Sequence, residues 1–259
     1  MKRSLLPLVV VLAVAVAAGA AWLVLSRGFD GSGSKVTTER RTLPPFARIV
    51  IEGQPDVTLV QGAAEGLVVE VPSRHQARVR AEVRDGTLVV TASDSRRWWS
   101  RLFGGGTRAP RITVTFRDLD ALQVAGAVKI RADGLKADRL AITATGAASL
   151  KLAGLDVGEL SVEGAGAIKA ELAGRAVVQK VAISGAGSYR AADLASDRAA
   201  IAVSGAGRVV VHAEKTLSVA LSGAGVVEYL GDPEVKQEIS GAGRVRKRDA
   251  AEAGAPSVA

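Results

Sequence analysis

The chain has 259 residues, is 3% aromatic, and contains 29 Gly but no Cys. The absence of Cys excludes disulfide scaffolds, thiolate metal sites and thiol catalysis, and two His leave little material for histidine-based catalysis or metal binding. The formal net charge of +8 comes from scattered cations. This favours a modest attraction to anionic lipid or acidic glycan over nucleic-acid binding, because nucleic-acid binders concentrate their cations on one face.

Residues 1–27 have the pattern of an export segment. Lys2 and Arg3 precede the uncharged run 5–25, which is long enough to span a bilayer as a helix. The positive end stays in the cytoplasm, so we expect the rest of the chain to be exported, membrane-anchored, and either periplasmic or extracellular. Residues 18–20 also fit the cleavage site of a signal peptide, but the apolar run continues past them, which favours an uncleaved signal-anchor.

The next segments predict a linker and then strands. Residues 28–43 are rich in Gly, Ser and charge, which is typical of a flexible linker. From residue 44 to 120, apolar and polar residues alternate in short runs bounded by turn residues, which predicts β-strands. Asp85-Gly86 predicts a two-residue hairpin, because Gly tolerates the positive φ of a type I′ turn.

An internal repeat occupies residues 121–246. Ser-Gly-Ala-Gly occurs four times and looser copies occur three times, nearly all preceded by an alternating apolar pair. We expect the first glycine of each copy to turn the chain between two short strands, because such corners need φ values open only to Gly. These glycines are Gly126, Gly146, Gly164, Gly185, Gly205, Gly223 and Gly241.

A single repeat of about 19 residues cannot bury its own apolar side, whereas a stack of such repeats does bury it. The predicted fold is therefore all-β: a right-handed parallel β-helix, or β-solenoid, of about seven coils of ~19 residues. A β-rich N-terminal segment and an N-terminal transmembrane or signal helix precede it. The left-handed form has a strict coil length, and the variable spacing here favours the right-handed one.

Several of these motifs resemble a known family. Pro45-Phe46, Ile49-x-Ile51-x-Gly53, Asp85-Gly86-Thr87-Leu88 and the Ser-Gly-Ala-Gly ladder are similar to the bacterial family of auto-transporter adhesin head GIN domains, over residues 44–246. The resemblance implies an exported envelope protein, a right-handed parallel β-helix and a role in adhesion. The Gly-Ile-Asn tripeptide of the family's name does not occur in this chain. A related group of envelope β-repeat proteins that sense cell-wall stress has a similar pattern.

A loop at residues 93–110 is the candidate contact site outside the repeats. Its Trp and Arg residues are of the kinds enriched at binding hot spots and lipid interfaces. The candidate contact residues are Arg96, Arg97, Trp98, Trp99, Arg101 and Phe103. The alternative is that Trp98 and Phe103 fold back and cover the open end of the solenoid.

The sequence favours a non-enzymatic cell-envelope binding or adhesion module presented on a flat solenoid face. The alternative is a periplasmic scaffold or an envelope-stress-sensing partner protein. A carbohydrate-active enzyme would need acids at one offset in adjacent repeats, and Asp133, Glu171 and Asp193 do not form such a set. We expect no catalytic residue, metal or cofactor, and we interpret Lys129, Lys151 and Lys169 as a solvated strand face.

The expected partners are an envelope glycan, a protein or an anionic membrane surface, with the N-terminal helix in the membrane. No nucleic-acid partner is expected. Open strand edges invite pairing, so a homo-oligomer is a further expectation. Residues 247–259 predict a disordered tail, because large apolar residues are scarce there.

Overall fold

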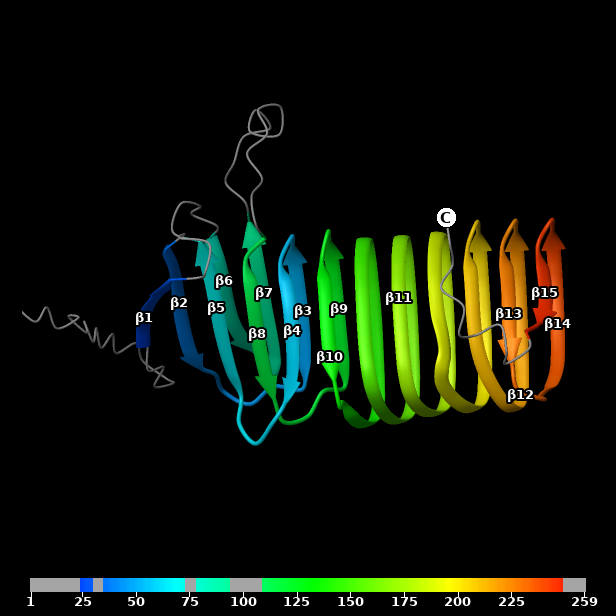
Figure 1. Cartoon of the computed structure of the whole chain (residues 1–259), viewed down its shortest axis with the longest axis horizontal. Helices are drawn as coiled ribbons and strands as arrows, with labels where there is room; N and C mark the ends of the chain where they lie inside the picture. The colour runs from blue at the N-terminus through cyan, green and yellow to red at the C-terminus, as the bar shows by residue number, and fades with distance from the viewer. Residues whose placement is uncertain (1–23, 30–34, 73–77, 94–108, 249–259) are drawn as a thin grey trace, which may run out of the picture.

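The computed structural model describes residues 24–29, 35–72, 78–93 and 109–248, and their fold is all-β (Figure 1). All fifteen strands belong to one sheet. In chain order they are β1 (Val24–Phe29), β2 (Lys35–Thr42), β3 (Arg48–Gly53), β4 (Asp56–Gln61), β5 (Gly66–Pro72), β6 (Arg78–Arg84), β7 (Thr87–Ser93), β8 (Arg111–Phe116), β9 (Ala121–Gly126), β10 (Lys129–Asp133), β11 (Lys136–Gly205), β12 (Arg208–Gly223), β13 (Val226–Leu230), β14 (Glu234–Gly241) and β15 (Arg244–Lys247).

The sheet curls so that two arms face each other. The first arm contains β3, β9, β14 and the parts of β11 and β12 that lead to a corner glycine. The second arm contains β4, β10, β13, β15 and the parts of β11 and β12 that follow a corner. β11 and β12 run through both arms, and the bends between the arms are visible at the lower side of Figure 1.

Successive repeats pair in parallel within each arm. In the first arm Thr143 pairs with Gln123, and Ser204 pairs with Ser222. In the second arm Lys129 pairs with Ser149. Each residue therefore has its counterparts in the neighbouring repeats beside it, so the outer surface consists of rows of equivalent side chains.

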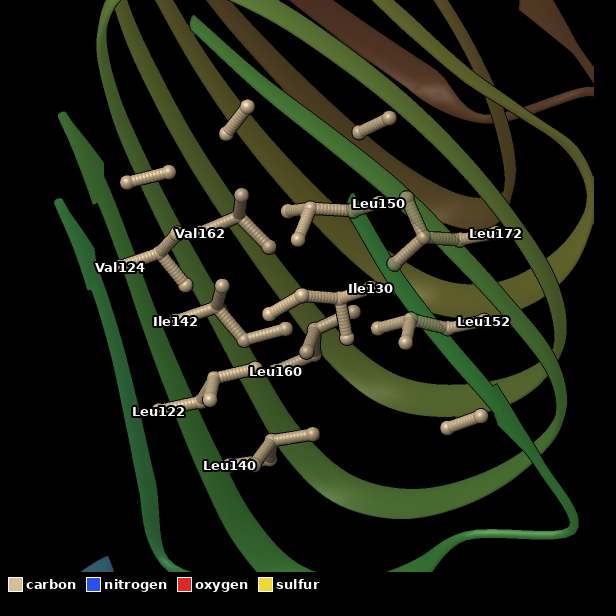
Figure 2. Close-up of a cluster of buried hydrophobic side chains, with 14 of the residues drawn as sticks. Leu122, Val124, Ile130, Leu140, Ile142, Leu150, Leu152, Leu160, Val162 and Leu172 are labelled. Carbon is tan, nitrogen blue, oxygen red and sulfur yellow. The ribbon is translucent and has the colours of Figure 1, made fainter. Parts of the chain in front are cut away.

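The space between the arms is filled by apolar side chains. Strand alternation sends every second residue inward, and these residues are almost all Leu, Ile, Val and Ala. Figure 2 shows Leu122, Ile142 and Val162 of the first arm pointing toward Ile130 and Leu150 of the second. Both arms need this contact, because burial of the facing apolar surface is the main stabilising term.

One polar cluster lies within this interior. Gln179 occupies an inward position, and its Nε2 donates to the Tyr189 hydroxyl at 2.6 Å. The Ser196 hydroxyl donates to the backbone oxygen of His212 at 2.6 Å and lies 3.3 Å from Gln179 Oε1. Burial raises the pKa of the Tyr189 phenol, against the smaller opposing effect of the Gln179 hydrogen bond. The three side chains satisfy one another, as buried polar groups must.

The prediction of a right-handed parallel β-helix was wrong. The structure is a curled, half-barrel sheet: one continuous sheet includes both arms, and β11 continues through the bends as a single strand of 70 residues. At the N-terminal end the pairing is antiparallel in β1–β2, β2–β5, β5–β8 and β6–β7. Inward–outward alternation is the same in a closed β-helix and in a curled sheet, so the periodic pattern could not separate them.

The N-terminal region also differs from expectation. The predicted linker 28–43 contains β2, which pairs with β5, and β1 consists of residues 24–27 of the expected leader and residues 28–29 of the linker. Val36, Thr37 and Thr38 favour strands because they are β-branched. The described residues include no helix long and apolar enough to cross a membrane, and residues 1–23 of the expected N-terminal helix lie outside them. The predicted hairpin is confirmed: β6 and β7 pair antiparallel around Asp85 (φ 48°) and Gly86 (φ 69°).

Candidate binding surfaces

A shallow, mostly apolar groove of about 640 Å³ crosses the outer face of the first arm. Small, exposed side chains form its floor over consecutive repeats, among them Ala182, Ala202 and Ala220. Ala202 pairs with Ala220, so the alanines lie side by side across the strands. A sheet face that carries only small side chains is flat, and it lets a partner approach close to the backbone.

Hydroxyl and carboxylate groups border this groove. Ser204, Ser222 and Ser240 are paired neighbours and form one polar row along it. Glu163 and Glu238 also line the groove. The groove therefore combines an apolar floor with hydrogen-bonding groups, and its charged side chains are acidic.

The outer face of the second arm has the opposite charge. A smaller pocket of about 190 Å³ lies there, lined among others by Lys129, Arg131, Lys151 and Lys169. The carboxylate of Glu171 shares this pocket and lies 3.2 Å from both the Lys169 and the Arg190 nitrogens. The hydrogen bond from Lys169 lowers the pKa of Glu171 most, and the charges of Lys169, Arg190 and Lys151 add to that effect against a smaller opposing desolvation.

The structure places a row of glycines at the bends where the first arm ends. Gly126, Gly146, Gly185, Gly205, Gly223 and Gly241 all have positive φ there. In the remaining repeat the positive φ lies at Gly166 (φ 114°) rather than at Gly164, which faces the interior at the position that Ala144 and Ile183 hold in neighbouring repeats. Both glycines flank Ala165, so the tripeptide alone did not indicate which one forms the corner.

The candidate contact residues Arg96, Arg97, Trp98, Trp99, Arg101 and Phe103 lie outside the described residues. The disordered tail predicted over 247–259 is likewise outside them from residue 249. Of the two histidines, His212 lies in β12, and its Nε2 is 2.9 Å from Glu214 Oε1. Among the described residues, no three His, Cys, Asp or Glu side chains gather into a metal site.

Comparison with known proteins decides the family. The family model described as "Putative auto-transporter adhesin, head GIN domain" matches residues 45–233. The chain belongs to this family. The head GIN match covers the strands from β3 to β13 completely, so both candidate surfaces lie almost entirely within the family domain.

Solved structures share the fold of this head GIN protein. A putative adhesin from Bacteroides fragilis is 20% identical, with a TM-score of 0.74 over 82% of this chain and 97% of that one. A putative adhesin from Parabacteroides distasonis is 21% identical, with a TM-score of 0.62 over 83% and 98% of the two chains. A putative lipid binding protein from the same species is 20% identical, with a TM-score of 0.57 over 85% and 99%. No curated protein matches the chain.

Proposed function

We propose that this head GIN protein is an exported, non-enzymatic binding module of the cell envelope that makes adhesion-type contacts through the outer faces of its curled sheet. The groove on the first arm carries this proposal. It extends over six repeats, from Thr143 to Ser240, which at about 4.8 Å per strand is a length of about 24 Å. An extended and shallow surface of this kind suits a macromolecular partner.

The family supports the same reading. The family and the similar solved structures are described as putative adhesins or as a putative lipid binding protein, and none of those named above as an enzyme. Export follows from the charged and apolar pattern at residues 1–27, which predicts an N-terminal signal or anchor. The uncleaved anchor remains part of the proposal.

The groove is tested by filling it. Ala202→Lys places a long charged side chain on its floor, and Ala141→Lys is the matched control, because Ala141 is an exposed, outward residue of the same arm that does not line the groove. Fluorescently labelled full-length protein is incubated with isolated bacterial cell envelopes, and the bound fraction is measured together with the thermal midpoint.

We expect Ala202→Lys to lower the bound fraction at least five-fold and Ala141→Lys to change it less than two-fold. Both thermal midpoints should stay close to that of the unaltered protein, because both side chains can extend into solvent. Equal envelope binding by all three proteins would show that the groove is not the contact surface.

A further inference from the structure

The third residue after each corner glycine forms one row across the outer face of the second arm. Lys129 pairs with Ser149, and Ser188 pairs with Arg208. The backbones of Gly146, Gly166 and Gly185 approach one another in turn, which places Lys169 between Ser149 and Ser188. From Gly126 to Gly205 the row therefore alternates between cation and serine: Lys129, Ser149, Lys169, Ser188 and Arg208. Beyond Arg208 the row continues with Val226 and Arg244, and on its other side Asp56 pairs with Lys129.

A second row lies two residues further along each strand. Arg131 pairs with Lys151, and Glu171 and Arg190 continue the row. Arg131 is held by Asp56, with 2.7 Å between Nη1 and Oδ1. Among the described residues, no carboxylate oxygen lies within 4.0 Å of Lys129, Lys151 or Arg208. These nine positions carry six cations and one anion, and Asp56 beside Lys129 adds a second anion, so the face is basic.

The interval between cations in the first row is regular. Neighbouring strands lie about 4.8 Å apart, so cations on alternate repeats are about 9.6 Å apart along the sheet. One sugar of an extended polysaccharide advances by nearly one strand spacing. A linear chain with an acid group on every second sugar therefore presents its charges at the interval of Lys129, Lys169 and Arg208.

The groups between the cations suit sugars as well. Ser149 lines the basic pocket beside Lys129 and Lys169, where its hydroxyl can donate to or accept from a sugar hydroxyl. Glu171 lines the same pocket, and its carboxylate can only accept hydrogen bonds. A phosphate chain offers no hydroxyl to this carboxylate and is repelled by it, whereas a polysaccharide offers many.

The same face is poorly suited to a membrane. Lipid interfaces favour Trp, Phe or Leu side chains that insert beside the cations. Among the described residues of the second arm, the outward positions of β10 and of the following two repeats carry no aromatic side chain. The positive charge here lies on a flat polar surface without apolar anchors.

We propose that the second arm binds a linear acidic polysaccharide lying along the sheet. Lys129, Lys169 and Arg208 hold the acid groups of alternate sugars, and Ser149, Ser188 and Glu171 hydrogen-bond the sugars between them. This site is on a different face from the groove, so it extends the proposed adhesion-type function without depending on the groove.

Hyaluronan is a suitable probe, because it carries one carboxylate on every second sugar. Its binding to the full-length protein is measured by calorimetry, beside polyphosphate and vesicles containing phosphatidylglycerol. The test variant is Lys129→Gln, Lys169→Gln, Arg208→Gln. The matched control is Arg48→Gln, Arg198→Gln, Lys236→Gln, which removes the same charge from exposed positions of the first arm.

We expect the unaltered protein to bind hyaluronan more tightly than polyphosphate or the vesicles. The second-arm variant should lose at least ten-fold in affinity, and the first-arm control should lose less than two-fold. Absence of hyaluronan binding, an equal loss in both variants, or tighter binding of polyphosphate or vesicles would each overturn the proposal. None of these outcomes alters the groove test with Ala202→Lys. The proposed groove contact and the proposed polysaccharide site can therefore be contradicted independently of each other.

Discussion

Two constraints act on each corner glycine at once. Gly205 has φ 122°, which lies in a region that side-chain-bearing residues rarely adopt. A Cβ built on it would also lie 2.5 Å from the backbone oxygen of Gly185 in the preceding repeat. Backbone cannot move aside as a flexible side chain can, so the close stacking of the repeats and the corner conformation both require Gly.

Gly205→Ala should therefore destabilise the fold. Holding a non-glycine residue in such a conformation costs about 1–3 kcal/mol, and the contact with Gly185 adds to that cost. Urea denaturation measures the change in the free energy of unfolding. Gly66→Ala is the control, because the nearest heavy atom to its Cβ would be 3.8 Å away and its φ is not positive. A loss no larger for Gly205→Ala than for Gly66→Ala would contradict this account of the corner.

The corner residues also explain why the second-arm row escaped sequence analysis. Counted from Gly166, Lys169 stands at the same offset as Lys129 from Gly126, and Glu171 stands at that of Arg131. Counting from Gly164 gives Lys169 the offset of Lys151 instead, so the row that joins Lys129 and Lys169 does not show in the spacing. The spacing predicted most corners, but the choice between two glycines depends on backbone contacts between repeats.

At the scale of elements, carboxylates are held between cations of neighbouring segments. Glu159 lies 2.6 Å from the Lys180 nitrogen and 3.9 Å from that of Arg139. Asp197 lies between Lys215, at 2.7 Å, and Arg175, at 3.9 Å. Hydrogen bonds from Lys180 and Lys215 are the largest causes that lower the pKa values of Glu159 and Asp197, and the neighbouring positive charges add to them.

These ion pairs predict a loss of stability in acid. A carboxyl with a lowered pKa in the folded state stabilises it above the unfolded pKa, about 4, and that contribution is lost as the pH falls through the folded pKa. The thermal midpoint should therefore fall as the pH is lowered from 5 to 3. The fall should be smaller in Glu159→Gln, Glu171→Gln, Asp197→Asn, because that variant has already lost these ion pairs.

Glu163→Gln provides the control for the acid titration. Among the described residues, no Lys or Arg nitrogen lies within 4.0 Å of the Glu163 carboxylate, so this variant should keep the full fall. An equally steep fall in the triple variant would contradict a role for the ion pairs. Added salt should weaken the effect, since these side chains are exposed and their attraction is screened.

The sequence predicted strands better than strand partners. Alternation located β3, β4 and β9, and the Asp85-Gly86 turn located the hairpin of β6 and β7. β2 and its antiparallel pairing with β5 were missed, because residues 28–43 have the composition of a linker and carry no repeat. Pairing of such strands depends on contacts across the whole chain, which no local pattern records.

At the scale of the molecule, the curled sheet separates two chemistries. The groove of the first arm is apolar with acidic side chains, and the outer face of the second arm is basic. The apolar interior packs the inner faces of the two arms against each other, so both outer faces remain exposed at the same time. Under the two proposals above, the protein would hold two different partners at the same time.

The all-β class and the family could be predicted from the sequence, but the form of the sheet could not. A stack of coils and a curled sheet bury the same residues, and only the continuity of β11 through both arms distinguishes them. The candidate contact residues were placed in the loop 93–110 on composition alone. The groove was not found, because small exposed residues such as Ala202 and Ala220 give no composition signal.

Hydroxyl-radical footprinting of the full-length protein on bacterial cell envelopes shows directly which surfaces are covered on binding. The proposal is that the outer faces of the curled sheet make the binding contacts. We expect protection of first-arm peptides containing Ala202 and Ala220 and of second-arm peptides containing Lys129 and Lys169. Protection confined to peptides from 93–110, with both arms as reactive as in the free protein, would contradict it.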